Sequence, residues 1–254
     1  MKHPIYQRLI EARRRAPGFL WLVDPDKIDV RKPDPRWARA GEMGVTAFLV
    51  GSSQDDEANL DSSLAVLREH ATLPLILFPG SASQVSPHFD AVLFLTLLSG
   101  RNPEYLVGEQ VKGTPLIREY EIEPIPTGYI LVDTGTQTSV AKRSQTKPLS
   151  QSRVDLICDH ALCAEYMGHA FVYLEAGSGA GRPIESSVIE RVKAEITIPL
   201  IVGGGLKTPE ACAHAVSAGA DFIVVGTALE NDRSVGLLSG MVEAINVTKR
   251  AVKV

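Results

Sequence analysis

Eight short runs of aliphatic and aromatic residues recur along the chain, and they constrain its fold more than any other feature. Each run is continuous rather than alternating, which is typical of strands buried on both faces of a parallel sheet. The runs lie at residues 19–23, 47–50, 75–78, 91–95, 128–132, 170–174, 199–202 and 222–225. Helical patterns separate most of them, at residues 56–70, 154–167, 184–195, 209–218 and 235–247. This alternation predicts parallel β-α units, and eight strands are the number that closes an α/β barrel of the TIM (β/α)8 type.

Three stretches depart from a regular barrel. Residues 79–90 are too short and too rich in serine, glycine and proline for a crossover helix, so we expect a modified barrel that lacks its third helix. Residues 133–152 are long and polar, which predicts a mobile loop over the catalytic face. Residues 1–17 predict an N-terminal helical extension that covers the bottom of the barrel. Without an internal repeat or a domain boundary, residues 1–254 are expected to form a single domain.

Composition and charge exclude several classes of function. A net charge of -4 and a pI near 5.9 give no support to nucleic-acid binding. The longest apolar runs reach about eight residues, too short for a transmembrane segment, which leaves room only for transient membrane contact. The polar, basic start is unlike a signal peptide. Three cysteines without C-x-x-C spacing indicate reduced thiols, so we expect a cytoplasmic protein.

Two glycine-rich turns near the end of the chain predict a phosphate site. Gly203-Gly204-Gly205 follows the seventh run, and Gly226-Thr227 follows the eighth. In barrels of this type, the loops after strands seven and eight present backbone N–H groups to phosphate. Glycine lets the backbone approach the phosphate oxygens closely. The alternative is that these glycines only form tight turns, but their occurrence in this order favours phosphate.

A third loop, which follows the sixth run, predicts both a phosphate contact and a catalytic group. Its sequence from residue 173 to 181 is Tyr-Leu-Glu-Ala-Gly-Ser-Gly-Ala-Gly, so its backbone and Ser178 are placed to complete the phosphate site. Glu175 lies where a side chain points into the mouth of the barrel. A carboxylate there can accept a hydrogen bond from a substrate hydroxyl and assist its deprotonation. The alternative role for Glu175 is an ordinary structural ion pair.

The ends of the first two runs predict a metal site. Asp24-Pro25-Asp26-Lys27 closes the first run, and Gly51-Ser52-Ser53 closes the second. Asp24 and Ser53 offer the hard oxygen ligands that Mg²⁺ prefers beside a phosphate site. Taken alone, Asp-Pro-Asp is equally typical of a turn.

The combination of these motifs resembles one family closely, the geranylgeranylglyceryl phosphate synthases and their bacterial relatives. The likeness runs in order from Gly18 to Leu229. It rests on the segments at residues 22–27, 48–53, 78–80, 173–179 and 202–205. Residues 102–105 and 123–129 resemble the second of the family's two groups, which is shared by many archaea and some bacteria.

The resemblance implies a modified barrel without its third helix and a specific reaction. A polyprenyl group, typically geranylgeranyl, moves from its diphosphate to the C3 hydroxyl of sn-glycerol 1-phosphate with Mg²⁺, forming an ether lipid precursor. Carried over, Asp24 and Ser53 match the metal positions, and Asp24 and Glu175 the catalytic ones. The implied glycerol-phosphate site comprises Tyr173, Leu174, Glu175, Ala176, Gly177, Ser178, Gly179, Gly204, Gly205, Gly226 and Thr227. The chain departs from the family in Ser52, where glycine is commoner, and in its Thr/Ser-rich segment after Asp133.

Charge and shape suggest how such a reaction would run. Mg²⁺ on Asp24 would neutralise the leaving diphosphate, with help from basic groups near the mouth. Those groups are Lys27, Arg101, Lys142 and Arg143. The missing third helix would leave a side groove for the prenyl tail. Its leucines would be Leu93, Leu95, Leu97 and Leu98.

Two other functions fit parts of the sequence. One is a barrel isomerase or lyase that acts on a phosphorylated metabolite, because the glycine loops would look the same. The other is a barrel that binds a phosphorylated ligand without catalysis, against which the presence of both Asp24 and Glu175 argues. The family forms dimers and hexamers, so the resemblance also implies a homo-oligomer.

Overall fold

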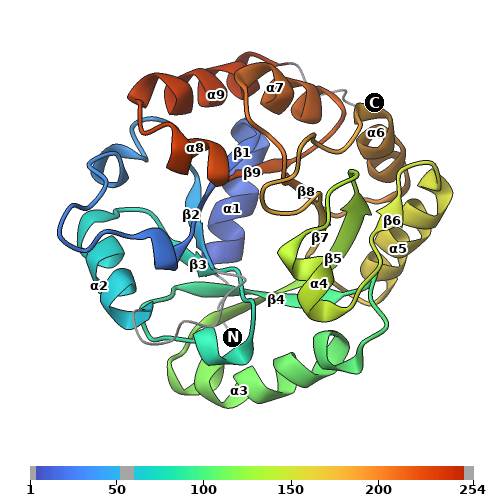
Figure 1. The fold of residues 1–254 in the computed structure, drawn as a ribbon, viewed down its shortest axis with the longest axis horizontal. Helices are drawn as coiled ribbons and strands as arrows, with labels where there is room; N and C mark the ends of the chain where they lie inside the picture. The colour runs from blue at the N-terminus through green and yellow to red at the C-terminus, as the bar shows by residue number, and fades with distance from the viewer. Residues whose placement is uncertain (1–3, 52–59, 249–254) are drawn as a thin grey trace.

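The computed structural model describes residues 4–51 and 60–248, and its centre is a closed barrel of parallel strands (Figure 1). The barrel strands are β1 (Gly18–Val23), β2 (Ala47–Val50), β3 (Leu75–Leu77), β4 (Ala91–Leu97), β5 (Glu123–Asp133), β7 (Phe171–Glu175), β8 (Leu200–Gly203) and β9 (Phe222–Val225). Pairing of β1 with β9 and of β4 with β5 closes the ring. The short strand β6 (Leu149–Ser150) pairs with the carboxyl end of β5, at Val132 and Asp133. The predicted barrel is therefore confirmed.

Helices surround the ring, as the alternating pattern predicts. They are α2 (Leu60–His70), α3 (Glu109–Glu119), α5 (Val154–Tyr166), α6 (Ser186–Glu195), α7 (Pro209–Ser217), α8 (Thr227–Asn231) and α9 (Val235–Val247). No helix within the described residues is long and apolar enough to cross a membrane.

The connection between β3 and β4 lacks a full helix, which confirms the prediction for this segment. It holds only the single 3-10 turn η4 (Ala82–Gln84). The helix that follows β4 was not predicted from sequence. It begins with a π-turn, η5 (Glu104–Gly108), and continues as α3, and the glycines and the proline within it weaken the helical pattern. α3 lies beside the β3–β4 connection, over the part of the barrel wall that has no crossover helix.

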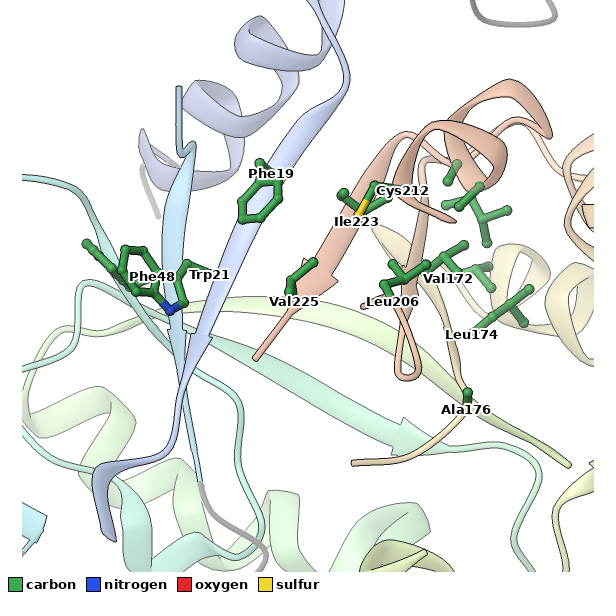
Figure 2. Packing of buried hydrophobic residues seen from close by; sticks show 14 of the residues in the cluster. Phe19, Trp21, Phe48, Val172, Leu174, Ala176, Leu206, Cys212, Ile223 and Val225 are labelled. Carbon is green, nitrogen blue, oxygen red and sulfur yellow. The ribbon is translucent and has the colours of Figure 1, made fainter. Parts of the chain in front are cut away.

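The strands divide the core into two layers, because successive side chains point to opposite faces. The outer layer packs strands against helices, and Figure 2 shows Phe19 and Trp21 of β1, Phe48 of β2, and Val172 and Leu174 of β7 within it. The inner layer fills the barrel with residues such as Leu20, Ile76, Tyr129 and Tyr173. The middle of the barrel is thus packed with side chains.

The N-terminal helix α1 (Pro4–Arg15) closes the end of the barrel where the strands begin. The carboxylate of Glu123, the first residue of β5, accepts hydrogen bonds from the backbone N–H groups of Ile5 and Tyr6 at 2.7 and 3.0 Å. At the other end of α1, Arg13 pairs with Asp221 at 2.7 Å. Leu9 between them is buried. The predicted covering helix is confirmed, and the other end of the barrel is left for the site.

The polar segment at residues 133–152 was predicted as a loop, but it contains the short helix α4 (Ser139–Ser144) and strand β6. Thr138 caps α4 by accepting a hydrogen bond from the N–H of Ala141 at 3.2 Å. Val140, Arg143 and Ser144 line the cavity at the strand ends, so the segment lies over the catalytic face as expected. Its mobility stays a prediction.

Candidate active site

A cavity of about 200 Å³ opens at the carboxyl ends of the barrel strands. One end of it is polar and is formed by the loops after β7, β8, β9 and β1. The other end is apolar and lies beside β3, β4 and α3. Most of the predicted site residues share the polar end: Asp24, Tyr173, Glu175, Gly177, Ser178, Gly179, Gly204, Gly205, Gly226 and Thr227.

The glycines of the polar end are required by close approach as well as by conformation. Gly204 has φ +83°, and a Cβ there would lie 2.5 Å from Oε1 of Glu175. Gly177 has φ +100°, and a Cβ there would lie 1.9 Å from the Cγ2 atom of Thr138 in the covering segment. Side chains are therefore excluded where the loops after β7 and β8 meet, and backbone lines the cavity instead.

Glu175, the last residue of β7, is the buried carboxylate of the site. Only 5% of it is exposed, and its Oε1 accepts a hydrogen bond of 2.5 Å from the backbone N–H of Gly177. Burial raises the pKa of Glu175 to about 7, although the Gly177 N–H opposes this shift. A carboxylate with this pKa can exchange a proton with a substrate near neutral pH.

Two buried phenols lie near this carboxylate. Burial, with a smaller contribution from the charge of Glu175, raises the pKa of Tyr129 and of Tyr173 well above the usual value. The hydroxyl of Tyr173 is buried and makes no hydrogen bond of good geometry within the described residues, but it lies close enough to the Glu175 carboxylate to lower the pKa of Glu175 and raise that of Tyr173. A buried hydroxyl without a partner is costly, so this hydroxyl can donate either to Glu175 or to a polar ligand in the cavity.

Asp24 follows β1 and lies at the edge of the same cavity. Its Oδ1 accepts a hydrogen bond from the N–H of Asp26 at 3.1 Å, and its Oδ2 lies 3.2 Å from Nζ of Lys27. The same Nζ lies 2.8 Å from Oε2 of Glu230 on α8. Lys27 thus links the loop after β1 to the helix after β9.

The metal site predicted at Asp24 has only part of its donor set within the described residues. Ser53, its second predicted ligand, lies outside them. In the described ranges, no group of three or more acidic, histidine or cysteine side chains could hold a metal ion. Mg²⁺, however, needs only one or two carboxylates when water and substrate phosphates complete its shell. Asp24 and Glu230 both line the cavity, so the donor set fits such an ion.

A buried arginine, Arg36, holds α8 in place from the outer side of the barrel. The guanidinium of Arg36 donates to the carbonyl of Leu229 at 2.7 Å and to those of Asp232 and Ser234 at 3.1 and 3.3 Å. It pairs with Asp34 at 2.7 Å and stacks on the ring of Trp21. Because α8 begins at Thr227, this arginine anchors the helix that follows the Gly226 turn.

The remaining predicted residues divide into two sets. Lys27 and Arg143 line the cavity, as expected for charges near the mouth, but Arg101 and Lys142 do not. Arg101 bonds instead to the carbonyls of its own turn, those of Leu98 and Gly100. The side chains of Leu174 and Ala176 lie in the outer core rather than in the cavity, so only their backbone belongs to the loop.

The apolar end of the cavity is the space that a third crossover helix would occupy in a regular barrel. Leu93, Leu95 and Leu97 line it, but Leu98 faces the outer core and does not. Its other wall comes from η4, η5 and α3, with the side chains of Val85, Tyr105 and Ile117. These residues were not predicted because the helix that carries most of them was not.

The short strand β3 opens this part of the barrel wall. It pairs with β4 at Ala91 and Val92, and among the described residues the later part of β4 has no strand partner on that side. Gln110 of α3 takes the place of a strand there, because its side-chain N–H donates to the carbonyl of Leu95.

Sequence reasoning also missed Lys207 and Phe78 as site residues, although both line the cavity. Lys207 follows the glycine triplet within two residues, and this proximity to a phosphate loop was a usable signal. Phe78 ends the third apolar run and carries no polar group that would distinguish it from the core.

A closed parallel barrel with a glycine-lined cavity and a buried carboxylate at its carboxyl end defines a (β/α)8-barrel enzyme. Comparison with known proteins identifies which one. The PcrB family matches residues 8–249. The chain belongs to this family.

Curated relatives that carry the name geranylgeranylglyceryl phosphate synthase cover almost the whole chain. The protein of Flavobacterium johnsoniae is 41% identical over 90% of this chain and 94% of its own. That of Chitinophaga pinensis is 37% identical over the full length of both. That of the archaeon Thermococcus kodakarensis is 40% identical over 89% of each.

Solved structures agree with the sequence relatives. The synthase of Thermoplasma acidophilum, solved with its substrate sn-glycerol-1-phosphate, is 35% identical, with a TM-score of 0.85 over 97% of this chain and 99% of its own. The synthase of Thermoplasma volcanium is 32% identical, with a TM-score of 0.88 over 95% and 97%. The tryptophan synthase alpha chain of Legionella pneumophila is 18% identical with a TM-score of 0.57, a likeness of fold alone.

Proposed function

We propose that the protein is a prenyltransferase that joins a polyprenyl group from its diphosphate to the C3 hydroxyl of sn-glycerol 1-phosphate. The observation that carries this proposal is the two-ended cavity, in which the buried Glu175 lies at a glycine-lined polar end that opens into an apolar groove. A glycerol phosphate suits the first end and a prenyl chain the second. The synthases among the relatives support the same reaction.

The acceptor would bind with its phosphate against the backbone of the loops after β7, β8 and β9. Ser178 and Lys207 line this end of the cavity and can add a hydroxyl and a cation to the backbone N–H groups. The buried hydroxyl of Tyr173, which lies near Glu175, can bond to the glycerol. Glu175 would accept a hydrogen bond from the attacking C3 hydroxyl and take its proton as the new bond forms.

The donor would lie with its prenyl chain in the apolar groove and its diphosphate toward the mouth. Leu93, Leu95 and Leu97 offer the chain an apolar wall. Lys27 and Arg143 line the mouth and can neutralise part of the diphosphate charge.

Asp24 would hold the Mg²⁺ that the reaction is expected to use. A bound Mg²⁺ would supply charge neutralisation for the departing diphosphate. The geranylgeranyl chain length, a homo-oligomeric state, a cytoplasmic location and the single-domain organisation stay predictions from the sequence. The rival functions, an isomerase or lyase and a non-catalytic binding barrel, are not favoured by relatives that are synthases over their full length.

The test is a lipid-extraction assay with radiolabelled sn-glycerol 1-phosphate and geranylgeranyl diphosphate in the presence of Mg²⁺. We expect label in the organic phase and stoichiometric release of diphosphate. sn-Glycerol 3-phosphate serves as the control for the acceptor, and farnesyl diphosphate for the donor chain. Binding of glycerol phosphate without transfer to any prenyl donor would instead support the binding barrel.

A further inference from the structure

Two carboxylates at the mouth of the cavity share the ammonium group of Lys27. Its Nζ lies 3.2 Å from Oδ2 of Asp24 and 2.8 Å from Oε2 of Glu230. Both carboxylates belong to the donor set that fits Mg²⁺. The other oxygen of Asp24, Oδ1, accepts the N–H of Asp26 within its own turn. Lys27 therefore engages the carboxylate oxygen of Asp24 that remains for a metal ion.

Lys27 is the member of this group of three that can change position most easily. Asp24 is held by its turn at the end of β1, and Glu230 lies on α8, which Arg36 anchors. Lys27 instead carries its charge on a flexible four-carbon chain. Its side chain is 54% exposed, against 24% for Asp24 and 20% for Glu230. Ion pairs that are this exposed contribute little, so a stronger cation can replace the ammonium group.

Open space lies on two sides of the three side chains. They line the main cavity and also a second cavity of about 220 Å³, whose other walls include Asp29 and Trp37. Lys27, Asp24 and Glu230 thus form part of the partition between the two cavities. The ammonium group can move there without disturbing the packed core.

Charge determines which ligand the ammonium group can serve. Two carboxylates and one ammonium group leave a net negative charge at this point of the mouth, which repels a diphosphate. A divalent cation on the carboxylates reverses the sign of this charge. Lys27, released from Asp24 and Glu230, can then donate to the diphosphate oxygens in a charge-assisted hydrogen bond.

We propose that Lys27 exchanges between two partners. It binds Asp24 and Glu230 before a divalent cation does, and it turns to the diphosphate of the donor once the cation takes those carboxylates. Metal and diphosphate therefore bind cooperatively, because both favour the same position of one side chain. This inference rests on the proposed function and assigns to Lys27 the coupling between the metal and the donor.

The test measures binding rather than turnover, on the full chain after treatment with EDTA. Mn²⁺ is the metal probe, and its dissociation constant is measured by electron paramagnetic resonance. Inorganic diphosphate is the probe for the donor, and its dissociation constant is measured by calorimetry with and without Mg²⁺. Lys27→Met removes the ammonium group and keeps the length of the side chain. Lys32→Met is the matched control, because it removes the same charge from the wall of the second cavity.

We expect Lys27→Met to bind Mn²⁺ about fivefold more tightly, because the carboxylates lose their competing cation. The same variant should bind diphosphate in the presence of Mg²⁺ about tenfold more weakly, because a charge-assisted hydrogen bond is lost. Glu230→Gln should show the reverse pattern, with weaker binding of Mn²⁺ and tighter binding of metal-free diphosphate. Lys32→Met should change neither dissociation constant.

The opposite signs in Lys27→Met decide the question, since a lysine with a structural role alone would weaken both ligands or neither. Either of these results would overturn the proposal. If Lys27→Met does not fold, Glu230→Gln gives the decision, and unchanged binding of Mn²⁺ in that variant overturns the proposal as well. The ether assay tests the proposed function separately. A wild-type protein that binds both probes but forms no ether contradicts that function, whereas the exchange of Lys27 is decided by the variants.

Discussion

Oε1 of Glu175 lies 2.5 Å from the backbone nitrogen of Gly177, two residues further along the chain. This bond fixes one carboxylate oxygen against the loop that is proposed to bind phosphate, and it leaves the second oxygen for the acceptor. The proposed base and the proposed phosphate site are thus parts of one short segment, and changes at either should affect the other.

Glu175 should set the pH dependence of transfer. Its pKa is raised to about 7, so the base form is lost as pH falls below that value. We expect the single-turnover rate to fall roughly tenfold per pH unit below about 7 and to level off above it. Glu175→Gln should lower the rate by about 10²–10⁴-fold and abolish this dependence. Glu175→Asp should rescue little, because the shorter side chain misplaces the carboxylate. A glutamine variant with normal turnover would show that Glu175 is structural.

The same residue should cost stability at high pH. A carboxyl group whose pKa is raised on folding stabilises the protein when protonated, and this contribution is lost as pH rises from about 4.5 to about 7. The Glu175→Gln variant has no carboxyl group to ionise, so its stability does not fall in this way as pH rises. Denaturant unfolding of both proteins at pH 5 and pH 8 should show the variant gaining up to about 3 kcal/mol relative to wild type at pH 8. An unchanged difference between the two pH values would mean that Glu175 titrates normally.

Gly204→Ala should damage both the acceptor site and the base. The new Cβ would lie 2.5 Å from Oε1 of Glu175, and the residue would keep φ +83°. We expect a rise in KM for glycerol phosphate and a fall in kcat of at least about a hundredfold, measured by steady-state kinetics. Gly168→Ala is the matched control, because Gly168 has φ +82° with nothing within 4 Å of its Cβ position. It should lose about 1 kcal/mol of stability and no activity.

Asp24→Asn should nearly abolish turnover while the protein stays folded. The change removes the carboxylate that is proposed to hold Mg²⁺, which should cost about a hundredfold or more in kcat. Titration of activity with Mg²⁺, after chelation with EDTA, should show a higher requirement in the variant. Asp26→Asn, in the same turn but outside the cavity lining, is the control. Normal kcat of Asp24→Asn at saturating Mg²⁺ would place the metal elsewhere.

Arg36 should act on acceptor binding through α8. Arg36→Lys keeps the charge but cannot reproduce the bonds to three carbonyls, so the Gly226 turn should lose its support. We expect KM for glycerol phosphate to rise about tenfold, with a much smaller change in KM for the donor. Arg36→Met leaves Asp34 without its partner and should cost about 3 kcal/mol or more in stability. Arg39→Lys, at an exposed ion pair, should change neither quantity.

The barrel could be predicted from sequence because its strands are buried on both faces. This burial makes each strand a continuous apolar run, and the residues that end the runs are those that meet at one edge of the barrel. Gly204 and Glu175 were found in this way, since each lies at a strand end. The shortness of the segment between β3 and β4 predicted the missing helix by chain length alone.

The groove could not be predicted in the same way. Its wall depends on α3, whose pattern is weakened by Gly113 and Pro115, and on which side of β4 each leucine faces. Leu97 and Leu98 are adjacent in sequence and differ only in that respect. Arg36 was also missed, because its role depends on carbonyl groups almost two hundred residues away in the chain. Such contacts leave no local pattern.

The open wall between β3 and β4 makes the length of one connection a determinant of what the protein can accept. A few inserted residues at 79–90 would be enough to complete a regular crossover helix and fill the groove, without any change at Glu175 or the glycine loops. Deletions there would instead remove η4 and with it part of the groove wall. Insertions and deletions in this segment, rather than point substitutions at the strand ends, are therefore the changes by which a lineage built on this barrel could gain or lose a long-chain substrate.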